Sequence, residues 1–264
     1  MQAAFRQDFA KVFRYGDSGL EKLVYFKSPV RADGCPAASK RGSPDGGKSE
    51  NNIIRARTAV RELILCNEWQ LFGTFTLDAS KYDRHNLPRW RSDFSQFLRD
   101  QRKKWHMDVK FLLIPEHHKN GAWHMHGVFG GLSVPAIRPF SADERLPADM
   151  LTKIRSGEVL SDWPDYRRKF GFVSFSGIRD RARCAGYVTK YVSKDLGGRG
   201  AELGAHLYYA SQGLARASVI YDGGCIFQKC NSISKTSGSK LSGQRTPSIG
   251  KLSLQTDGFT IFGK

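Results

Sequence analysis

The chain has 264 residues, of which 40% are hydrophobic, enough for a core in one domain with extensions or in two small domains. Its 42 Lys and Arg against 25 Asp and Glu give a formal net charge of +17, which favours a polyanionic partner, nucleic acid before an anionic membrane surface. No apolar run of about 18 residues and no signal-peptide core is present, which argues against a membrane-spanning or secreted protein and favours the cytoplasm.

The N-terminal part of the chain predicts three elements and a loop. Apolar residues within 5–13 recur at helical spacing and predict a helix, and Leu23–Phe26 is typical of a strand. Residues 31–50 are rich in Gly, Pro, Ser and charge and indicate a loop. A further helix is predicted to begin near Asn52. Its side chains expected in the core, together with the tryptophan after it, are Val60, Leu63, Ile64 and Trp69.

The middle of the chain predicts a strand, a helix and a hairpin. Leu71–Leu77 is typical of a strand, and Pro88 suits the first turn of a helix. Core positions then follow at spacings of three and four residues: Trp90, Phe94, Phe97 and Leu98. Val109–Glu116 and Trp123–Phe129 indicate two strands around Asn120-Gly121, a strong hairpin signal.

The remaining chain predicts one more strand and one more helix. Residues 133–169 are irregular to helical, Phe172–Ile178 indicates a strand and Arg181–Leu196 a helix. From Gly223 onward Ser, Gly, Lys and Thr dominate, which predicts a flexible tail.

This order of elements predicts an α+β fold, in which an antiparallel central sheet is covered by helices packed mainly on one face. We expect an N-terminal extension and loop at residues 1–51, a folded domain at 52–221 and a basic, Ser- and Gly-rich tail at 222–264. The hairpin would supply central strands, and the last helix would cross above them.

Two histidines in the second hairpin strand form a candidate metal site. His124 and His126 point to the same face of a strand, while Met125 points to the other. A three-residue loop ending at Gly121 places Glu116 opposite His124 and on its face, whereas a two-residue Asn-Gly turn would place it opposite Met125. Two nitrogens and a carboxylate suit Mn²⁺ or Mg²⁺, and zinc is chemically possible.

The predicted helix near residue 190 offers nucleophiles. Tyr187 and Tyr191 lie four residues apart and share a face that Lys190 and Lys194 border. A phenolic oxygen can attack phosphorus and form a covalent phosphotyrosine. The opposite side is apolar and is expected to pack on the sheet: Ala185, Val188, Val192 and Leu196.

Other residues could bind ligands but have weaker support. His117 and His118 are expected at the surface near the turn, with His118 an alternative contact for metal or DNA. Gly42–Ser49 fits a phosphate-binding loop, but the polar, proline-containing segment before it is no strand, so no nucleotide cofactor is expected. The five cysteines are scattered and indicate reduced thiols, and Cys225 and Cys230 lack a second Cys or His pair for zinc.

At His124-Met125-His126 and Tyr187-x-x-x-Tyr191 the chain resembles the HUH endonuclease superfamily, whose catalytic domain is an RRM-like α+β fold. With Lys190, Lys194 and the strand Phe72–Asp78, it is similar to the rolling-circle replication initiators of single-stranded DNA phages, prophages and small plasmids. The segment from about Asn52 to Leu196 also looks like replication-associated proteins of bacterial mobile elements. The tyrosines follow the histidines, as in initiators and some transposases.

The resemblance implies a metal-dependent nick in one strand at a single-stranded DNA origin, through a 5′-phosphotyrosine link, followed by rejoining. It implies a host helicase and DNA polymerase as partners in a bacterial cytoplasm, without a membrane partner. Two alternatives stay open at this point: a single-strand transposase with the same chemistry, and a non-catalytic single-stranded DNA-binding protein.

Overall fold

The computed structural model describes residues 5–6, 9–26, 30–31, 50–118, 120–194, 206–224, 253–255 and 259–263. Contacts divide the chain into two compact units, one made of Met1–Gly42 with Ala215–Lys264 and the other of Ser43–Leu214. The expected boundaries at residues 51 and 221 thus lie within several residues of the observed ones. The Gly42–Ser49 pattern, Cys225, Cys230 and most of the expected tail lie outside the described residues.

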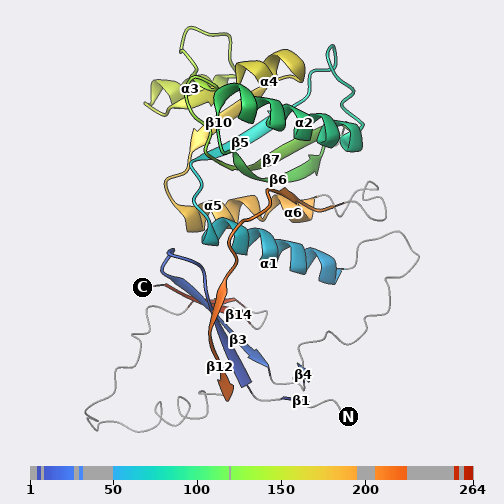
Figure 1. Ribbon diagram of the computed structural model, residues 1–264. Coiled ribbons are helices and arrows are strands. Elements are labelled where there is room, and N and C mark those ends of the chain that lie inside the picture. Colours follow the sequence, from blue (N-terminus) through green and yellow to red (C-terminus); the bar gives the residue numbers. More distant parts are fainter. Residues whose placement is uncertain are drawn as a thin grey trace. The chain divides into compact units, whose positions relative to one another are not determined.

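The larger unit is built on an antiparallel sheet with the strand order β11-β6-β7-β5-β10-β9-β8 (Figure 1). Its strands are β5 (Leu71–Thr76), β6 (Lys110–His117), β7 (Trp123–Gly130), β8 (Arg138–Pro139), β9 (Leu160–Asp162), β10 (Val173–Gly177) and β11 (Tyr209–Ala210). Its helices are α1 (Glu50–Cys66), α2 (Leu87–Trp105), α3 (Ala148–Arg155), α4 (Pro164–Lys169), α5 (Arg181–Val188) and α6 (Tyr191–Lys194). The predicted α+β class and antiparallel sheet are confirmed.

Helices lie on both faces of this sheet rather than mainly on one. Figure 1 shows α2 and α4 on one side and α5 and α6 on the other, with α1 beyond them. Side chains alternate along a strand, so each face has its own set of residues. The face under α2 and α4 is aromatic: the ring of Phe75, which is 1% exposed, lies 5.5 Å from Phe94, 5.1 Å from Tyr166 and 5.6 Å from Phe175.

The start and end of α2 follow from its sequence. The side chain of Asn86 caps the helix by accepting a hydrogen bond from the Arg89 N–H at 3.0 Å, and Pro88 lies in the first turn. His106 ends the helix in the left-handed conformation. All the core side chains predicted for α1 and α2, and Trp69, are buried: Val60, Leu63, Ile64, Trp69, Trp90, Phe94, Phe97 and Leu98.

The predicted helix Arg181–Leu196 is divided, which corrects the expectation of one continuous helix. α5 ends at Val188 and α6 begins at Tyr191. Between them the Thr189 hydroxyl donates to the carbonyl oxygens of Ala185 and Gly186, and the Lys190 N–H donates to Tyr187, three residues back. A side-chain donor and an i to i−3 bond tighten the chain into a turn. Residues 195 and 196 lie outside the described part.

The smaller unit is an antiparallel sheet with the order β12-β2-β3-β14-β13. Its strands are β2 (Phe9–Arg14), β3 (Leu20–Phe26), β12 (Ser218–Gly224), β13 (Ser253–Gln255) and β14 (Phe259–Gly263), and β1 (Phe5–Arg6) pairs with β4 (Val30–Arg31). The helix predicted within residues 5–13 is therefore wrong. A spacing of four residues also fits one face of a strand, where the ring of Phe9 stacks on Phe26 at 4.6 Å.

Among the described helices, none combines the length and the apolar character that crossing a membrane requires.

The hairpin tolerates no side chain at Gly127, which directly follows His126. A Cβ atom there would meet the backbone of β6, namely the Leu112 carbonyl oxygen and, at 2.9 Å, the Leu113 Cα. We expect Gly127→Ala to lower the free energy of unfolding by about 1–3 kcal/mol, measured as a fall in Tm.

Gly186→Ala is the matched control for this substitution. Nothing lies within 4 Å of a Cβ at Gly186, which sits inside α5, so the change should leave Tm unchanged or raise it. An equal fall in Tm for both variants would contradict the close approach of β6 and β7.

Candidate active site

The register of the β6–β7 hairpin brings the predicted acidic and imidazole residues together. Glu116 pairs with His124, and the His118 N–H donates to the Ala122 carbonyl at 2.9 Å. The loop is therefore residues 119–121, and Gly121 has a φ of +82°. The three-residue loop is confirmed, and the two-residue alternative is excluded.

Glu116 and His126 are in direct contact within this face. The Nε2 atom of His126 lies 2.6 Å from Oε2 of Glu116, and the two side chains are almost fully buried. A contact of this length is a charge-assisted hydrogen bond, which fixes the orientation of the imidazole ring. One nitrogen and one carboxylate oxygen thus already converge on one point of the sheet.

The strand β5 holds the other nitrogen of each histidine. Thr74 pairs with His126 and Thr76 with His124. The Oγ1 atom of Thr74 lies 3.3 Å from Nδ1 of His126, and Oγ1 of Thr76 lies 3.4 Å from Nδ1 of His124. The sequence analysis did not identify these threonines, although alternate positions in Phe72–Asp78 predict that they share a face.

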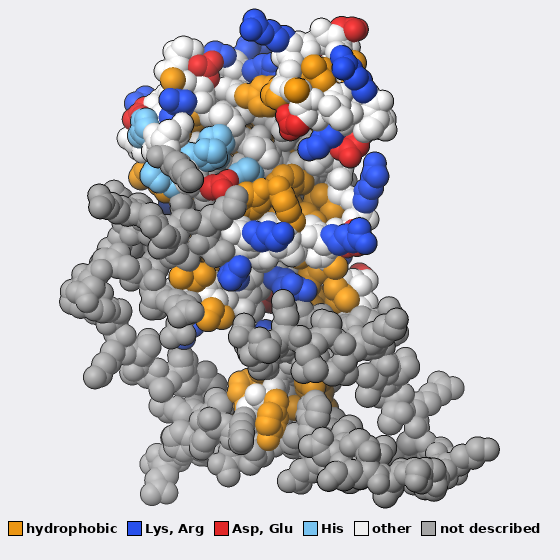
Figure 2. Space-filling model, turned by 180° about the vertical axis from the view of Figure 1, so that it is seen from behind, with side chains coloured by type: hydrophobic (Ala, Val, Ile, Leu, Met, Phe, Trp, Pro, Cys, Tyr) orange, Lys and Arg blue, Asp and Glu red, His pale blue; other side chains and the backbone are white. Residues whose placement is uncertain are grey.

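His124 is more accessible than His126 and has a different neighbour. Its ring stacks on His118, with centroids 4.1 Å apart. Burial, followed by the nearby His118 and His126, lowers the pKa of His124 to about 4, so the ring is neutral at pH 7 with a lone pair for a ligand. Figure 2 shows histidine side chains gathered on one face of the larger unit. His117 instead lies against Trp123, with ring centroids 4.5 Å apart.

Both tyrosines face the sheet and meet the histidines there. The ring of Tyr191, which is 7% exposed, stacks on His126 with centroids 3.9 Å apart. Its hydroxyl donates a hydrogen bond of 2.5 Å to the Tyr187 hydroxyl. Tyr187 is 47% exposed, and its ring contacts the edge of Phe72 at 5.4 Å. Burial, and then this hydrogen bond, raise the pKa of Tyr191.

The predicted orientation of this helical segment was wrong. The tyrosine side faces the sheet, and α5 packs against α1 on its other side (Figure 1). Ala185, Val188 and Val192 are buried as expected, whereas Leu196 lies outside the described residues.

The two predicted lysines differ in what the structure describes. The Nζ atom of Lys190 lies 6.0 Å from the centroid of the Tyr187 ring, so its charge is near the more exposed hydroxyl. Lys194 ends α6, and its side chain lies outside the described residues.

The donor chemistry of this site fits a divalent cation, but the side chains do not surround one. Glu116, His124 and His126 share a face and offer one carboxylate and two imidazoles. Within the part of the chain that is described, no three His, Cys, Asp or Glu side chains converge as a ligand group. His124 stacks on His118 instead, so binding requires its ring to turn towards Glu116.

Comparison with known proteins agrees with this arrangement. Residues 70–196 match the family model of the replication-associated protein ORF2, and this match extends from the start of β5 past the end of α6. It includes Glu116, both histidines and both tyrosines, and it supports a replication-associated protein. No curated protein and no solved structure matches the chain.

The threonine contacts can be tested without an activity assay. We expect Thr74→Val to change the imidazole ¹⁵N chemical shifts of His126, because the Nδ1 atom loses its polar neighbour, and to leave those of His124 largely unchanged. Thr76→Val should do the reverse, so each variant is the control for the other. Both spectra are recorded with a chelator present. Shifts that move together in both variants would contradict the pairing of one threonine with one histidine.

Proposed function

We propose that this chain starts the replication of a DNA element by cutting one strand with a tyrosine and later rejoining it, as a rolling-circle initiator. One observation carries the proposal: the hydroxyl groups of Tyr187 and Tyr191 meet beside the Glu116–His126 pair. The match to replication-associated proteins and the net charge of +17 support DNA as the substrate.

The proposed cut is a transfer of a phosphoryl group between oxygens. A tyrosine hydroxyl loses its proton as its oxygen bonds to phosphorus, and the bond from phosphorus to the 3′ oxygen breaks. The 3′ oxygen takes up a proton and becomes the primer for synthesis, while the 5′ phosphate stays on the tyrosine. Attack by a 3′-hydroxyl reverses these changes and rejoins the strand, so rejoining needs no ATP.

Glu116, His124 and His126 would hold a divalent cation, with Mn²⁺ or Mg²⁺ the best fit to two nitrogens and a carboxylate. When bound, such a cation would withdraw charge from the phosphate that is cut. Thr74 and Thr76 would then fix which nitrogen of each ring faces the ligand.

Two tyrosines suit a reaction that cuts twice. One can hold the 5′ end of the parent strand while the other cuts the regenerated origin. Tyr187, exposed and close to the charge of Lys190, is open to an incoming phosphate, and Tyr191 donates the hydrogen bond that would stabilise its developing charge. Lys194 would add a second positive charge from the same segment.

The cellular setting follows from this chemistry. The substrate would be an origin in single-stranded form, in the cytoplasm of a bacterial host. A helicase and a DNA polymerase of the host would separate the strands and extend the 3′ end. The element could be a phage, a prophage or a small plasmid.

Removal of the metal should abolish cutting. We expect a single-stranded origin oligonucleotide to be cut with Mn²⁺ or Mg²⁺ and to stay intact in excess chelator, assayed on a denaturing gel. His124→Ala and His126→Ala should each reduce cutting by about 100-fold or more and keep most of the charge-driven DNA binding. Full activity in excess chelator would refute the metal assignment.

Single substitutions of the tyrosines should separate two nucleophiles from one. We expect Tyr187→Phe and Tyr191→Phe each to retain partial nicking, because the hydroxyl groups are adjacent and either can reach the same phosphate. The double variant should form no covalent adduct with DNA, measured by the mass shift of a labelled oligonucleotide on a denaturing gel. If one single variant is inactive and the other is unchanged, the enzyme has one nucleophile and one packing tyrosine.

A further inference from the structure

We propose that the opposite face of the sheet carries a second binding site for single-stranded DNA, in a groove between α2 and the β6–β11 edge. It rests on the proposed function only in taking DNA as the partner. The site would bind a segment of the strand several nucleotides away from the cut, with a base in an aromatic pocket and phosphates along α2.

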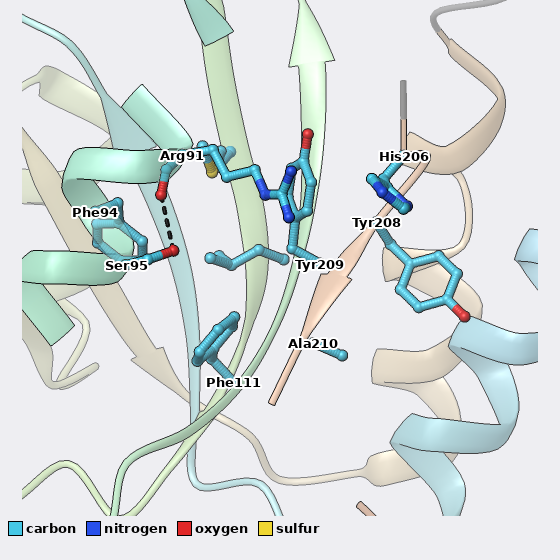
Figure 3. A pocket seen from close by; sticks show the side chains of 10 residues that line it. Arg91, Phe94, Ser95, Phe111, His206, Tyr208, Tyr209 and Ala210 are labelled. Carbon is cyan, nitrogen blue, oxygen red and sulfur yellow. Dashed lines mark hydrogen bonds between the residues drawn. The ribbon is translucent and has the colours of Figure 1, made fainter. Parts of the chain in front are cut away.

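The pocket at one end of the groove has about 240 Å³ and a mixed aromatic and basic lining. Figure 3 shows the guanidinium group of Arg91 lying against the ring of Tyr209, 4.8 Å from its centroid, with Phe111 nearby. Arg91 has no carboxylate partner among the described residues. A flat cation over an aromatic ring is a surface on which a base can stack.

The edge strand β11 fixes the aromatic wall of this pocket. Tyr209 pairs with Leu113 of β6. Next to it, the Ser211 N–H donates to the Phe111 carbonyl, and the Phe111 N–H donates to the Ser211 hydroxyl, both at 2.9 Å. The aromatic side chains of the pocket are thus attached to paired backbone, which lowers the entropy cost of binding a ligand between them.

The adjoining part of the groove is a hollow of about 500 Å³ that is strongly basic. It shares Ser95, Phe111 and Ala210 with the pocket and adds Arg99, Arg102 and Lys110. Asp108 is the single acidic side chain among the described residues that line the pocket and the hollow.

One guanidinium in the hollow is incompletely satisfied. Arg102 donates to the Val109 carbonyl, but its Nε atom is buried and has no hydrogen-bond partner. A buried donor of this kind is a place where an anion gains a contact.

The spacing along α2 matches a polymer rather than a small ion. Arg91, Ser95, Arg99 and Arg102 follow one another at intervals of four and three residues, so they line one side of the helix over roughly 16 Å. That length exceeds several times the distance of about 3.4 Å between successive phosphates on one strand of a duplex. Cations in a row beside an aromatic pocket are the combination by which proteins bind single strands.

The two proposed DNA sites would lie back to back across the sheet. Met125 lines the pocket, whereas its neighbours His124 and His126 face the tyrosines. A strand that reaches both sites must pass around the edge of the sheet, so the groove would be used only by an oligonucleotide longer than the segment that is cut.

The test compares binding and cutting in the full chain. We expect Arg91→Ala and the pair Arg99→Ala with Lys110→Ala each to weaken binding of a mixed-sequence single-stranded 30-mer by about fivefold or more, measured by fluorescence anisotropy. The double variant should reduce the salt slope by about 0.7 for each phosphate that it no longer neutralises. Lys103→Ala, an exposed basic residue of α2 outside the groove, is the matched control and should change affinity less than about twofold.

Two further measurements separate this proposal from the proposed function. Cutting of a short oligonucleotide at saturating concentration should be the same in the groove variants and the wild type, and wild-type chain that fails to cut would refute the proposed function while leaving the binding test intact. An oligonucleotide carrying 5-iodouracil should cross-link to Tyr209 or Phe111.

Equal affinity in the Arg91→Ala, Lys103→Ala and wild-type chains would overturn the second site, and so would cross-links found only on the histidine face. A free deoxynucleotide that binds the pocket as tightly as the 30-mer would assign it to a small molecule and overturn the proposal as well.

Discussion

The site depends on the register of one β-hairpin. A strand alternates its side chains with a period of two, so a shift of one residue between β6 and β7 would turn Glu116 away from both histidines. Gly121 in the left-handed region and the closed pair of His118 and Ala122 set the loop at three residues. The same register places Met125 on the opposite face, so it determines both surfaces of the sheet.

The position of the tyrosines depends on a second local event, the turn between α5 and α6. In one continuous helix, residues four apart would be displaced by about 6 Å along the axis. The turn at Thr189 instead lets Tyr191 lie flat on His126 while its hydroxyl still reaches Tyr187. The stacked ring and the bonded hydroxyls join the helical segment to the sheet at the point where the imidazoles lie.

Much of the larger unit could be predicted because its signals are local. The capping residue and apolar spacing located α2, and the glycine of the loop fixed the position of Glu116. The direction in which the tyrosines face was predicted wrongly, because both sides of that segment are buried and periodicity cannot tell which one meets the sheet. The strand β2 was missed for a different reason. Its partner β12 lies far away in the chain, and spacing alone does not distinguish strand from helix when the apolar residues are four apart.

The pairing of Arg14 with Ser218 has a consequence for how the protein is made. A ribosome releases the strand β2 long before it synthesises β12, so the smaller sheet cannot be completed until the whole larger unit has emerged. Contacts between such distant segments form slowly compared with the local contacts of a hairpin or helix. A message that ends early would therefore yield a chain whose first strands expose unpaired edges, and such edges are recognised by chaperones and proteases. The smaller unit in this way reports that translation has reached its end.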